Sequence, residues 1–217
     1  MYKRQNISIV DPLFTIPILI LLGTAIKTRK RLFSFFAIGW ATFYLSLGFV
    51  QYERALSAAN ELAESRGHNA ERLTLKPSFG NLILWKSIYQ HEQTFYVDAI
   101  RAVQSSTVCL GESIKIFNYQ QHLPGLDKES QQAEDIERFR WFSQDYLGFD
   151  DEKNLVTDVR YSMLPNQIEP MWGLVIDDMQ DTNQHAIWWT GRDLDQREWD
   201  LFIDMLRGKE CGNSDLD

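Results

Sequence analysis

The feature that most constrains this sequence is an uncharged stretch near its start. Residues 32–50, LFSFFAIGWATFYLSLGFV, contain no Asp, Glu, Lys or Arg. At 1.5 Å per residue, a helix of this length spans about 28 Å, close to the roughly 30 Å hydrocarbon core of a bilayer. The stretch therefore predicts a transmembrane helix.

A second apolar segment precedes it, from Ile7 to Ile26, and contains Asp11. Its charge-free part, residues 13–26, spans only about 20 Å as a helix, so we expect a tilted or broken span. We interpret residues 1–51 as a two-helix transmembrane hairpin. A cleaved signal peptide fits less well, because a basic segment and another apolar run follow without a small-residue cleavage site. A buried hairpin in a soluble protein is the other alternative, and the length of the uncharged stretch argues against it.

The connection between the two segments is basic, with the sequence KTRKR at residues 27–31. By the positive-inside rule this connection faces the cytoplasm. Both ends of the hairpin, and everything after Gln51, are then expected on the other side of the membrane. Lys3 and Arg4 favour the opposite orientation, but they are fewer.

Charge is distributed unevenly along the chain. The first 50 residues hold six Lys and Arg against Asp11, a net charge of +5. Because the whole chain carries −8, residues 51–217 carry −13. Phosphate backbones and anionic surfaces repel so acidic a domain, which argues against nucleic-acid binding.

Cys109 and Cys211 are the only cysteines, and neither stands in a metal-binding spacing. Geometry rather than spacing decides whether two cysteines pair. Two free thiols are the simpler interpretation, and a disulfide between them is the alternative.

The rest of the chain reads as a helical stalk and one soluble domain. Residues 52–70 are rich in helix formers and contain a helix-ending Gly67. Residues 71–208 alternate short β-branched and aromatic runs with turns, as in an antiparallel meander. The strands are expected within residues 71–75, 81–90, 94–103, 113–119, 154–162, 171–178 and 185–189.

Two helices are also expected within this domain. Ile136, Phe139, Phe142 and Tyr146 recur with helical spacing. In the last helix Asp195 and Glu198 form a capping-box pattern and Gly208 ends the helix; its predicted buried residues are Trp199, Phe202, Ile203 and Leu206. We predict an α+β domain with one antiparallel sheet covered by helices on one face, followed by a tail at residues 209–217.

The soluble domain shows no motif for an active site. Its four histidines form no ligand spacing, and we interpret them as surface or turn residues. No GxSxG, P-loop or calcium loop occurs. The histidines are His68, His91, His122 and His185.

Asp11 is the one candidate site residue. A carboxylate at the edge of an apolar span is costly and often functional, which suggests a metal ligand or catalytic group. An Asp followed by Pro12 is also a helix cap followed by proline at the first helical position. Both roles stay open, and one residue can serve both.

Several segments together resemble a known family. IVDPLFTIPILILLG, AERLTLKPSFGNLILWKSIYQHEQTFYV, ERFRWFSQDYLGF and LVTDVRYSM occur in this order over residues 7–180. The resemblance includes a fairly specific pattern formed by Pro77, Asn81, Leu84 and Trp85. The chain thus resembles the bacterial family described as predicted membrane-bound metal-dependent hydrolases.

The resemblance implies an enzyme of the bacterial inner membrane that uses zinc or manganese to activate water. Of the family's supposed ligands only Asp11 has a counterpart here, because the Thr-His and His-Arg…His-Ser motifs of earlier spans are absent. The chain is therefore expected to be the C-terminal part of a longer protein, holding the last two spans of its helical bundle. We expect this part to be inactive alone. The substrate is open, and a lipid or phosphoester is suggested only by location.

The alternative is a membrane-tethered module without enzymatic activity. Such a module would use an exposed sheet edge or exposed aromatics such as Trp188 and Trp189 to bind a partner. Against this, adjacent aromatics in a strand are more often packed in the core.

Overall fold

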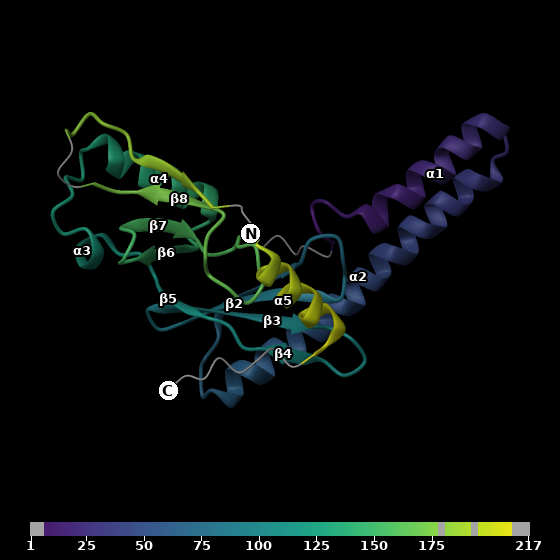
Figure 1. The fold of residues 1–217 in the computed structure, drawn as a ribbon, viewed down its shortest axis with the longest axis horizontal. Helices are drawn as coiled ribbons and strands as arrows, with labels where there is room; N and C mark the ends of the chain where they lie inside the picture. The colour runs from purple at the N-terminus through teal and green to yellow at the C-terminus, as the bar shows by residue number, and fades with distance from the viewer. Residues whose placement is uncertain (1–6, 178–180, 192–194, 210–217) are drawn as a thin grey trace.

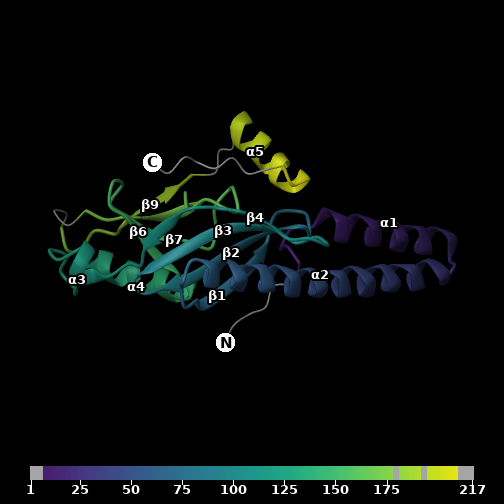
Figure 2. The same cartoon turned by 90° about the horizontal axis from the view of Figure 1, so that it is seen from below.

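The computed structural model describes residues 7–177, 181–191 and 195–209, which form an α+β protein. Two N-terminal helices, α1 (Pro12–Thr28) and α2 (Leu32–Ser65), form a hairpin that projects from two antiparallel sheets (Figures 1 and 2). Asp11 caps α1 and Pro12 occupies its first turn, where a missing N–H costs nothing. Arg29, in the left-handed region at φ 54°, ends α1 before the reversal.

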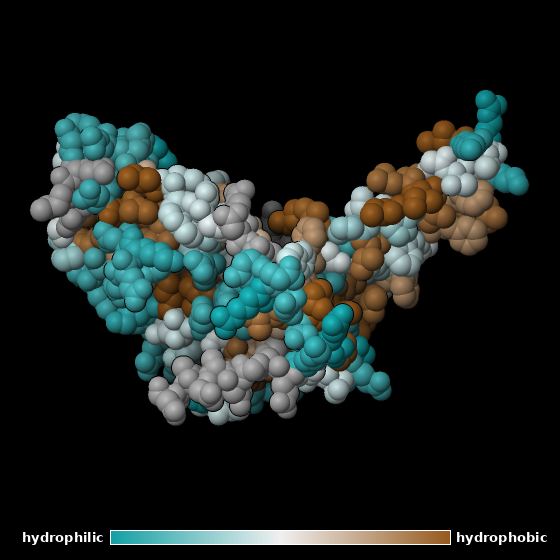
Figure 3. Space-filling model, viewed as in Figure 1, coloured by the Kyte–Doolittle hydropathy of each residue, from teal (hydrophilic) through white to brown (hydrophobic). Residues whose placement is uncertain are grey.

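The hairpin differs from the rest of the molecule in its surface. α2 is long and apolar enough, by length and composition, to cross a membrane, whereas α1 is a shorter apolar helix. Large apolar side chains such as Ile20, Phe35 and Phe43 are more than half exposed. Figure 3 shows this hydrophobic surface along the hairpin and a hydrophilic tip at its far end.

The second half of α2 belongs to the domain. Its alanines Ala55, Ala59 and Ala63 are fully buried, and the ring of Tyr52 meets Trp85 edge-on, with 5.9 Å between centroids. Small side chains let a helix approach a sheet closely, so this half packs flat against the first sheet. The segment expected as a stalk is therefore helical but forms part of the core, up to Ser65.

The first sheet, sheet A, contains β1 (Glu71–Pro77), β2 (Leu84–His91), β3 (Thr94–Arg101), β4 (Thr107–Cys109) and β5 (Ser113–Lys115). All pairs are antiparallel, and β4 and β5 both pair with β3. Gly111 lies between β4 and β5, where a Cβ would come within 2.2 Å of the Val97 carbonyl oxygen. Only glycine fits so close a backbone approach.

The second sheet, sheet B, contains β6 (Leu147–Asp150), β7 (Leu155–Asp158), β8 (Trp172–Val175) and β9 (Ile187–Thr190) in that order. The short α3 (Tyr119–His122) and the longer α4 (Gln131–Ser143) lie beside it. Ser130 caps α4, and Ile136 and Phe139 turn inward to share a core with Leu147 and Val156.

The last helix, α5 (Gln196–Arg207), has the predicted capping box of Asp195 and Glu198 and ends at Gly208. Phe202 and Met205 pack on the face of sheet A opposite α2 (Figure 2). Trp199, expected to be buried, is 45% exposed at the edge of this contact.

The architecture thus corrects one prediction. The antiparallel α+β class is confirmed, but the strands of the described residues form two sheets rather than one. Sheet A also has helices on both faces, α2 on one and α5 on the other. The strands after α4 form a sheet of their own, in which β6 pairs with β7. Backbone pairing next to sheet A is limited, among the described residues, to the bridge between Ile116 and Gly148 and the hydrogen bond from the Phe117 N–H to the Leu147 carbonyl oxygen.

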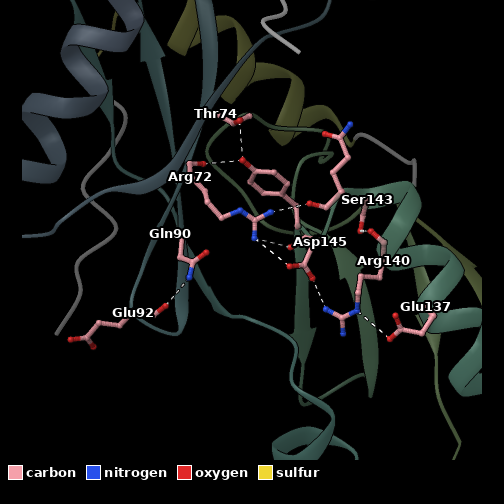
Figure 4. A network of polar contacts seen from close by, with 10 residues as sticks. Arg72, Thr74, Gln90, Glu92, Glu137, Arg140, Ser143 and Asp145 are labelled. Atoms are coloured by element: carbon pink, nitrogen blue, oxygen red, sulfur yellow. Dashed lines mark hydrogen bonds and ion pairs between the residues drawn. The ribbon is translucent and has the colours of Figure 1, made fainter. Parts of the chain in front are cut away.

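A polar network joins the two sheets (Figure 4). The guanidinium of Arg72 in β1 donates to the carbonyl oxygens of Gln144, at 2.9 Å, and Asp145. Asp145 in turn pairs with Arg140 of α4. Tyr146 donates from its hydroxyl to the Arg72 carbonyl oxygen, 2.9 Å away. The start of sheet B is thereby fastened to the first strand of sheet A.

The structure distinguishes between a free thiol and a disulfide at Cys109. Cys109, buried in β4, takes part in a disulfide. The free-thiol interpretation is therefore wrong for Cys109. Cys211 and most of the predicted tail lie outside the described residues.

Candidate functional site

A cleft of about 420 Å³ lies where the hairpin joins the domain. Its walls come from the segment before α1, the end of β1, the loop after β7, and α5. The loop after β1 lies close to the start of α1: a Cβ on Gly80 would be 3.4 Å from the Pro12 ring. Most of the lining is apolar, with Ile9, Pro77, Phe79, Met163, Met171 and Trp199.

Two lysines enter this apolar cleft from sheet A. Lys76 in β1 and Lys86 in β2 are register partners, so their side chains leave the same face of the sheet. Lys86 is only 5% exposed, and Lys76 is half-buried. A charge on a strand between two packed layers is expensive, and both lysines show its effect.

Burial lowers the pKa of both lysine side chains to about 7. Desolvation is the largest cause in each case. The next cause is repulsion, from Arg160 for Lys76 and from Lys76 for Lys86. The carboxylate of Asp158 acts in the opposite direction on both. Near neutral pH each lysine can therefore be charged or neutral.

The two lysines differ in their partners. Lys86 Nζ lies 2.6 Å from Ser162 Oγ and 2.8 Å from the Gln167 carbonyl oxygen. Lys76 Nζ lies 3.5 Å from the centre of the Tyr161 ring. Among the described residues, Lys76 makes no hydrogen bond or ion pair. In the part of the chain that the structure describes, the cleft therefore contains a lysine amine without an anionic partner.

Arg160 does not contribute an unpaired charge. Its Nε and Nη2 donate to the two carboxylate oxygens of Asp158, at 2.8 and 2.6 Å, and Nη2 also donates to the Phe142 carbonyl oxygen. Asp158 is fully buried. This bidentate pair holds the loop after β7 in shape, and so positions Tyr161 and Ser162 at the wall of the cleft.

Asp11, the residue singled out by the sequence, lies outside the lining of this cleft. One carboxylate oxygen accepts from the Phe14 N–H at 3.1 Å and the other from the Tyr44 hydroxyl at 2.8 Å. Asp11 is 4% exposed. It therefore caps α1 and ties α1 to α2.

A metal does not fit the donors in the described part of the chain. No three His, Cys, Asp or Glu side chains converge there, and both oxygens of Asp11 already accept hydrogen bonds. A zinc or manganese site needs several such ligands. The ligand role of Asp11 stays a prediction, and we derive no chemistry through a metal.

The remaining candidates of the sequence are scattered. His68 stacks on His91 with centroids 4.3 Å apart, His122 stacks on Phe149, and His185 meets Asp135. Trp188 lies in β9, an edge strand, and is 53% exposed. The expectation that it packs in the core is wrong: its ring meets Phe139 of α4 edge-on, with 5.8 Å between centroids, but more than half of the residue stays exposed.

Sequence reasoning missed Lys76, Lys86 and Ser162. One signal was present: Lys86 interrupts the apolar run ILW–SIY, in a segment predicted as a strand. A lysine there must be exposed at an edge or buried at a cost. Ser162 carried no signal, because the 76 positions between it and Lys86 hide their proximity.

Comparisons with models of known protein families, with curated proteins and with solved structures find no match. Nothing in them identifies the hydrolase family that the sequence resembles. The geometry of the cleft is therefore the basis for proposing a function.

Proposed function

We propose that this protein is a membrane-tethered domain that binds an amphiphile in the cleft at the base of its hairpin. The ligand would have an acyl chain and an anionic head group. The observation that carries the proposal is the combination, in one cleft, of an apolar lining and a lysine without an anionic partner among the described residues. The ligand's chain would occupy the apolar wall, and its head group would meet Lys76.

The exposed surface of the hairpin supports the tether. Both helices present large apolar side chains outward (Figure 3), and large exposed apolar patches mark membrane or protein contacts. With both helices in the membrane, the cleft would open close to the lipid surface, because Ser8 and Ile9 line it just before α1. An amphiphile would then pass from the bilayer to the cleft over a short distance.

The location of the domain follows from two observations. The basic turn between the helices favours a cytoplasmic tip, which puts the domain on the outer or periplasmic side of a bacterial inner membrane. The disulfide at Cys109 supports the same side, since disulfides persist in oxidising compartments.

The head-group preference follows from charge. Lys76 is flanked by Lys86, and the one buried carboxylate nearby, Asp158, is already paired with Arg160. An anion at Lys76 would stabilise its protonated form, so binding should be accompanied by proton uptake near pH 7. Carboxylate and phosphate head groups share this chemistry.

Binding can be tested with the full chain purified in maltoside detergent. Dodecyl phosphate, dodecanoate and uncharged dodecanol are titrated while tryptophan fluorescence is followed, because Trp199 lines the cleft. We expect saturable binding of the anions and weaker binding of the alcohol. Comparing the two anions distinguishes a phosphate from a carboxylate head group. Lys76→Met should weaken anion binding about tenfold, or about 1.4 kcal/mol.

The matched control is Lys115→Met, since Lys115 is an exposed lysine on β5, outside the cleft. It should bind like the wild type. Equal affinity of the Lys76→Met variant, or no saturation by any of the three ligands, would reject the proposed function.

A further inference from the structure

We infer that Ser162 and Lys86 form a nucleophile and general-base pair that cleaves a carboxylic ester of the bound amphiphile. The inference rests on the proposed function for its substrate class. It is distinct from metal-dependent hydrolysis, because both groups belong to this chain. Its basis is the 2.6 Å separation of Lys86 Nζ and Ser162 Oγ at the wall of the cleft.

Ser162 and Lys86 are placed like a nucleophile and its base. A serine nucleophile needs a base within hydrogen-bond distance, and a lysine can take this role in place of histidine. Ser162 is half-buried and lines the cleft, so a ligand in the cleft would lie beside it. Lys86 lies behind it, 5% exposed, and is thereby protected from bulk water. The nucleophile thus faces the ligand and the base lies beneath it.

The hydrogen-bond partners of Lys86 are uncharged. A buried lysine with a purely structural role is usually neutralised by a carboxylate. Here Nζ meets two neutral oxygens, Ser162 Oγ and the Gln167 carbonyl. The charged groups that act on it are Lys76, Asp158 and Glu112, and none of them is in hydrogen-bond contact with it. The site therefore favours a neutral amine, which is the form that accepts a proton.

The hydroxyl of Ser162 makes two hydrogen bonds. It donates to the Leu164 carbonyl oxygen at 2.5 Å and accepts from Lys86. When Lys86 is neutral, the hydroxyl proton can point to its nitrogen instead. Ser78 lines the same cleft with a buried hydroxyl that has no hydrogen-bond partner among the described residues. We assign to this hydroxyl the role of donor to the oxyanion that develops at the ester carbonyl.

The reaction is balanced without any metal or redox partner. Ser162 Oγ bonds to the ester carbonyl carbon while its proton moves to Lys86 Nζ. The C–O bond to the alcohol then breaks, and the alcohol takes that proton, leaving the acyl group on Ser162. Water attacks the acyl carbon, giving a proton to Lys86; the carboxylic acid leaves, and the proton returns to Ser162.

The test uses the full chain in detergent with p-nitrophenyl octanoate as substrate and a fluorophosphonate as a covalent probe of the serine. We expect turnover and labelling at Ser162. Ser162→Ala and Lys86→Met should each lower turnover at least about 100-fold. The exposed variants Ser105→Ala and Lys115→Met, which lie outside the cleft, are the matched controls and should keep wild-type turnover.

The pH profile separates a base from a structural lysine. Because the neutral amine is required, turnover should rise with pH through about 7 and then level off. Lys76→Met should move this rise to higher pH, because the charge of Lys76 lowers the pKa of Lys86. Asp158, Glu112 and Arg160 remain in place, so the direction of the shift depends on Lys76 alone.

Several results would overturn the inference. No labelling of Ser162 between pH 6 and pH 9, or turnover that survives Ser162→Ala, would exclude the pair. Turnover abolished by a chelator would support a metal-dependent reaction instead. Circular dichroism during thermal unfolding is measured on every variant to show that it folds, and dodecyl phosphate binding by the wild type is measured beside its turnover. Binding without turnover therefore rejects only the ester cleavage, whereas loss of binding by the wild type rejects the proposed function.

Discussion

The two halves of α2 are one continuous helix with opposite surfaces. Residues 32–50 present large side chains such as Phe35 and Phe43 outward, and these are more than half exposed. Residues 51–65 instead bury the small Ala55 and Ala59 completely against sheet A. One continuous helix therefore has an exposed half with large apolar side chains and a half that packs on sheet A through small ones.

The difference follows from what each half must pack against. Lipid chains accept bulky aliphatic and aromatic side chains of any shape, so the proposed membrane half needs only to be apolar. A sheet is a fixed surface, and a helix approaches it closely only through small residues. Three predictions test this contrast, beginning with the largest expected effect.

A charge in the packed half should unfold the domain. Ala59→Asp places a carboxylate in a fully buried site without a cation and should cost about 3–5 kcal/mol. Circular dichroism during thermal and urea unfolding of the purified protein measures this loss. Asn60→Asp, exposed on the next position, is the control and should change stability little. Equal stability of both variants would show that this half is not packed on sheet A.

A charge in the apolar half should leave the domain folded and impair insertion. Phe43→Arg places a cation near the middle of the proposed span, at about 2.5–3.5 kcal/mol in insertion experiments. A reporter enzyme that is active only outside the cytoplasm, fused after Asp217, should be active for the wild type and weaker for the variant. Phe43→Leu is the control. Activity of only a cytoplasmic reporter on the wild-type chain would reverse the proposed orientation.

The smallest effect is expected at Asp11, which links the two helices. Asp11→Ala removes the cap of α1 and leaves the Tyr44 hydroxyl unpaired, a loss of about 1–2 kcal/mol. Faster hydrogen exchange in the first turn of α1 would report it. Asp11→Asn keeps a capping oxygen and should exchange more slowly than the alanine variant. Zinc retained by the wild type but lost from Asp11→Asn would support the ligand role instead.

Much of the local structure could be predicted because its causes are local. Asp195 and Glu198 cap α5 as expected. The turn at Glu92 joins β2 and β3, which overlap two of the predicted strand segments. The α+β class and the long apolar helix follow from patterns within a few residues. The split into two sheets could not be predicted in the same way, because nothing local states which strand pairs with which.

The candidate site could be predicted only where its causes are local. Asp11 was identifiable because its charge stands out in an apolar segment, and its cap follows from the adjacent Pro12. The proposed pair of Lys86 and Ser162 depends on a loop after β7 that the Arg160–Asp158 ion pair holds against β2. Neither residue has a neighbour in the sequence that implies the other.

The sequence by itself determined the apolar hairpin, the acidic charge of the domain and the ends of its helices. These properties depend on composition and on contacts within one or two turns of chain. Only the tertiary structure decided that Lys76 and Lys86 share a cleft with Ser162, and that Cys109 is oxidised. Contacts between residues so far apart in the sequence depend on strand pairing and on the packing of α5 across sheet A. Burial then changes the chemistry of the lysines, since desolvation lowers a pKa only where the fold excludes water.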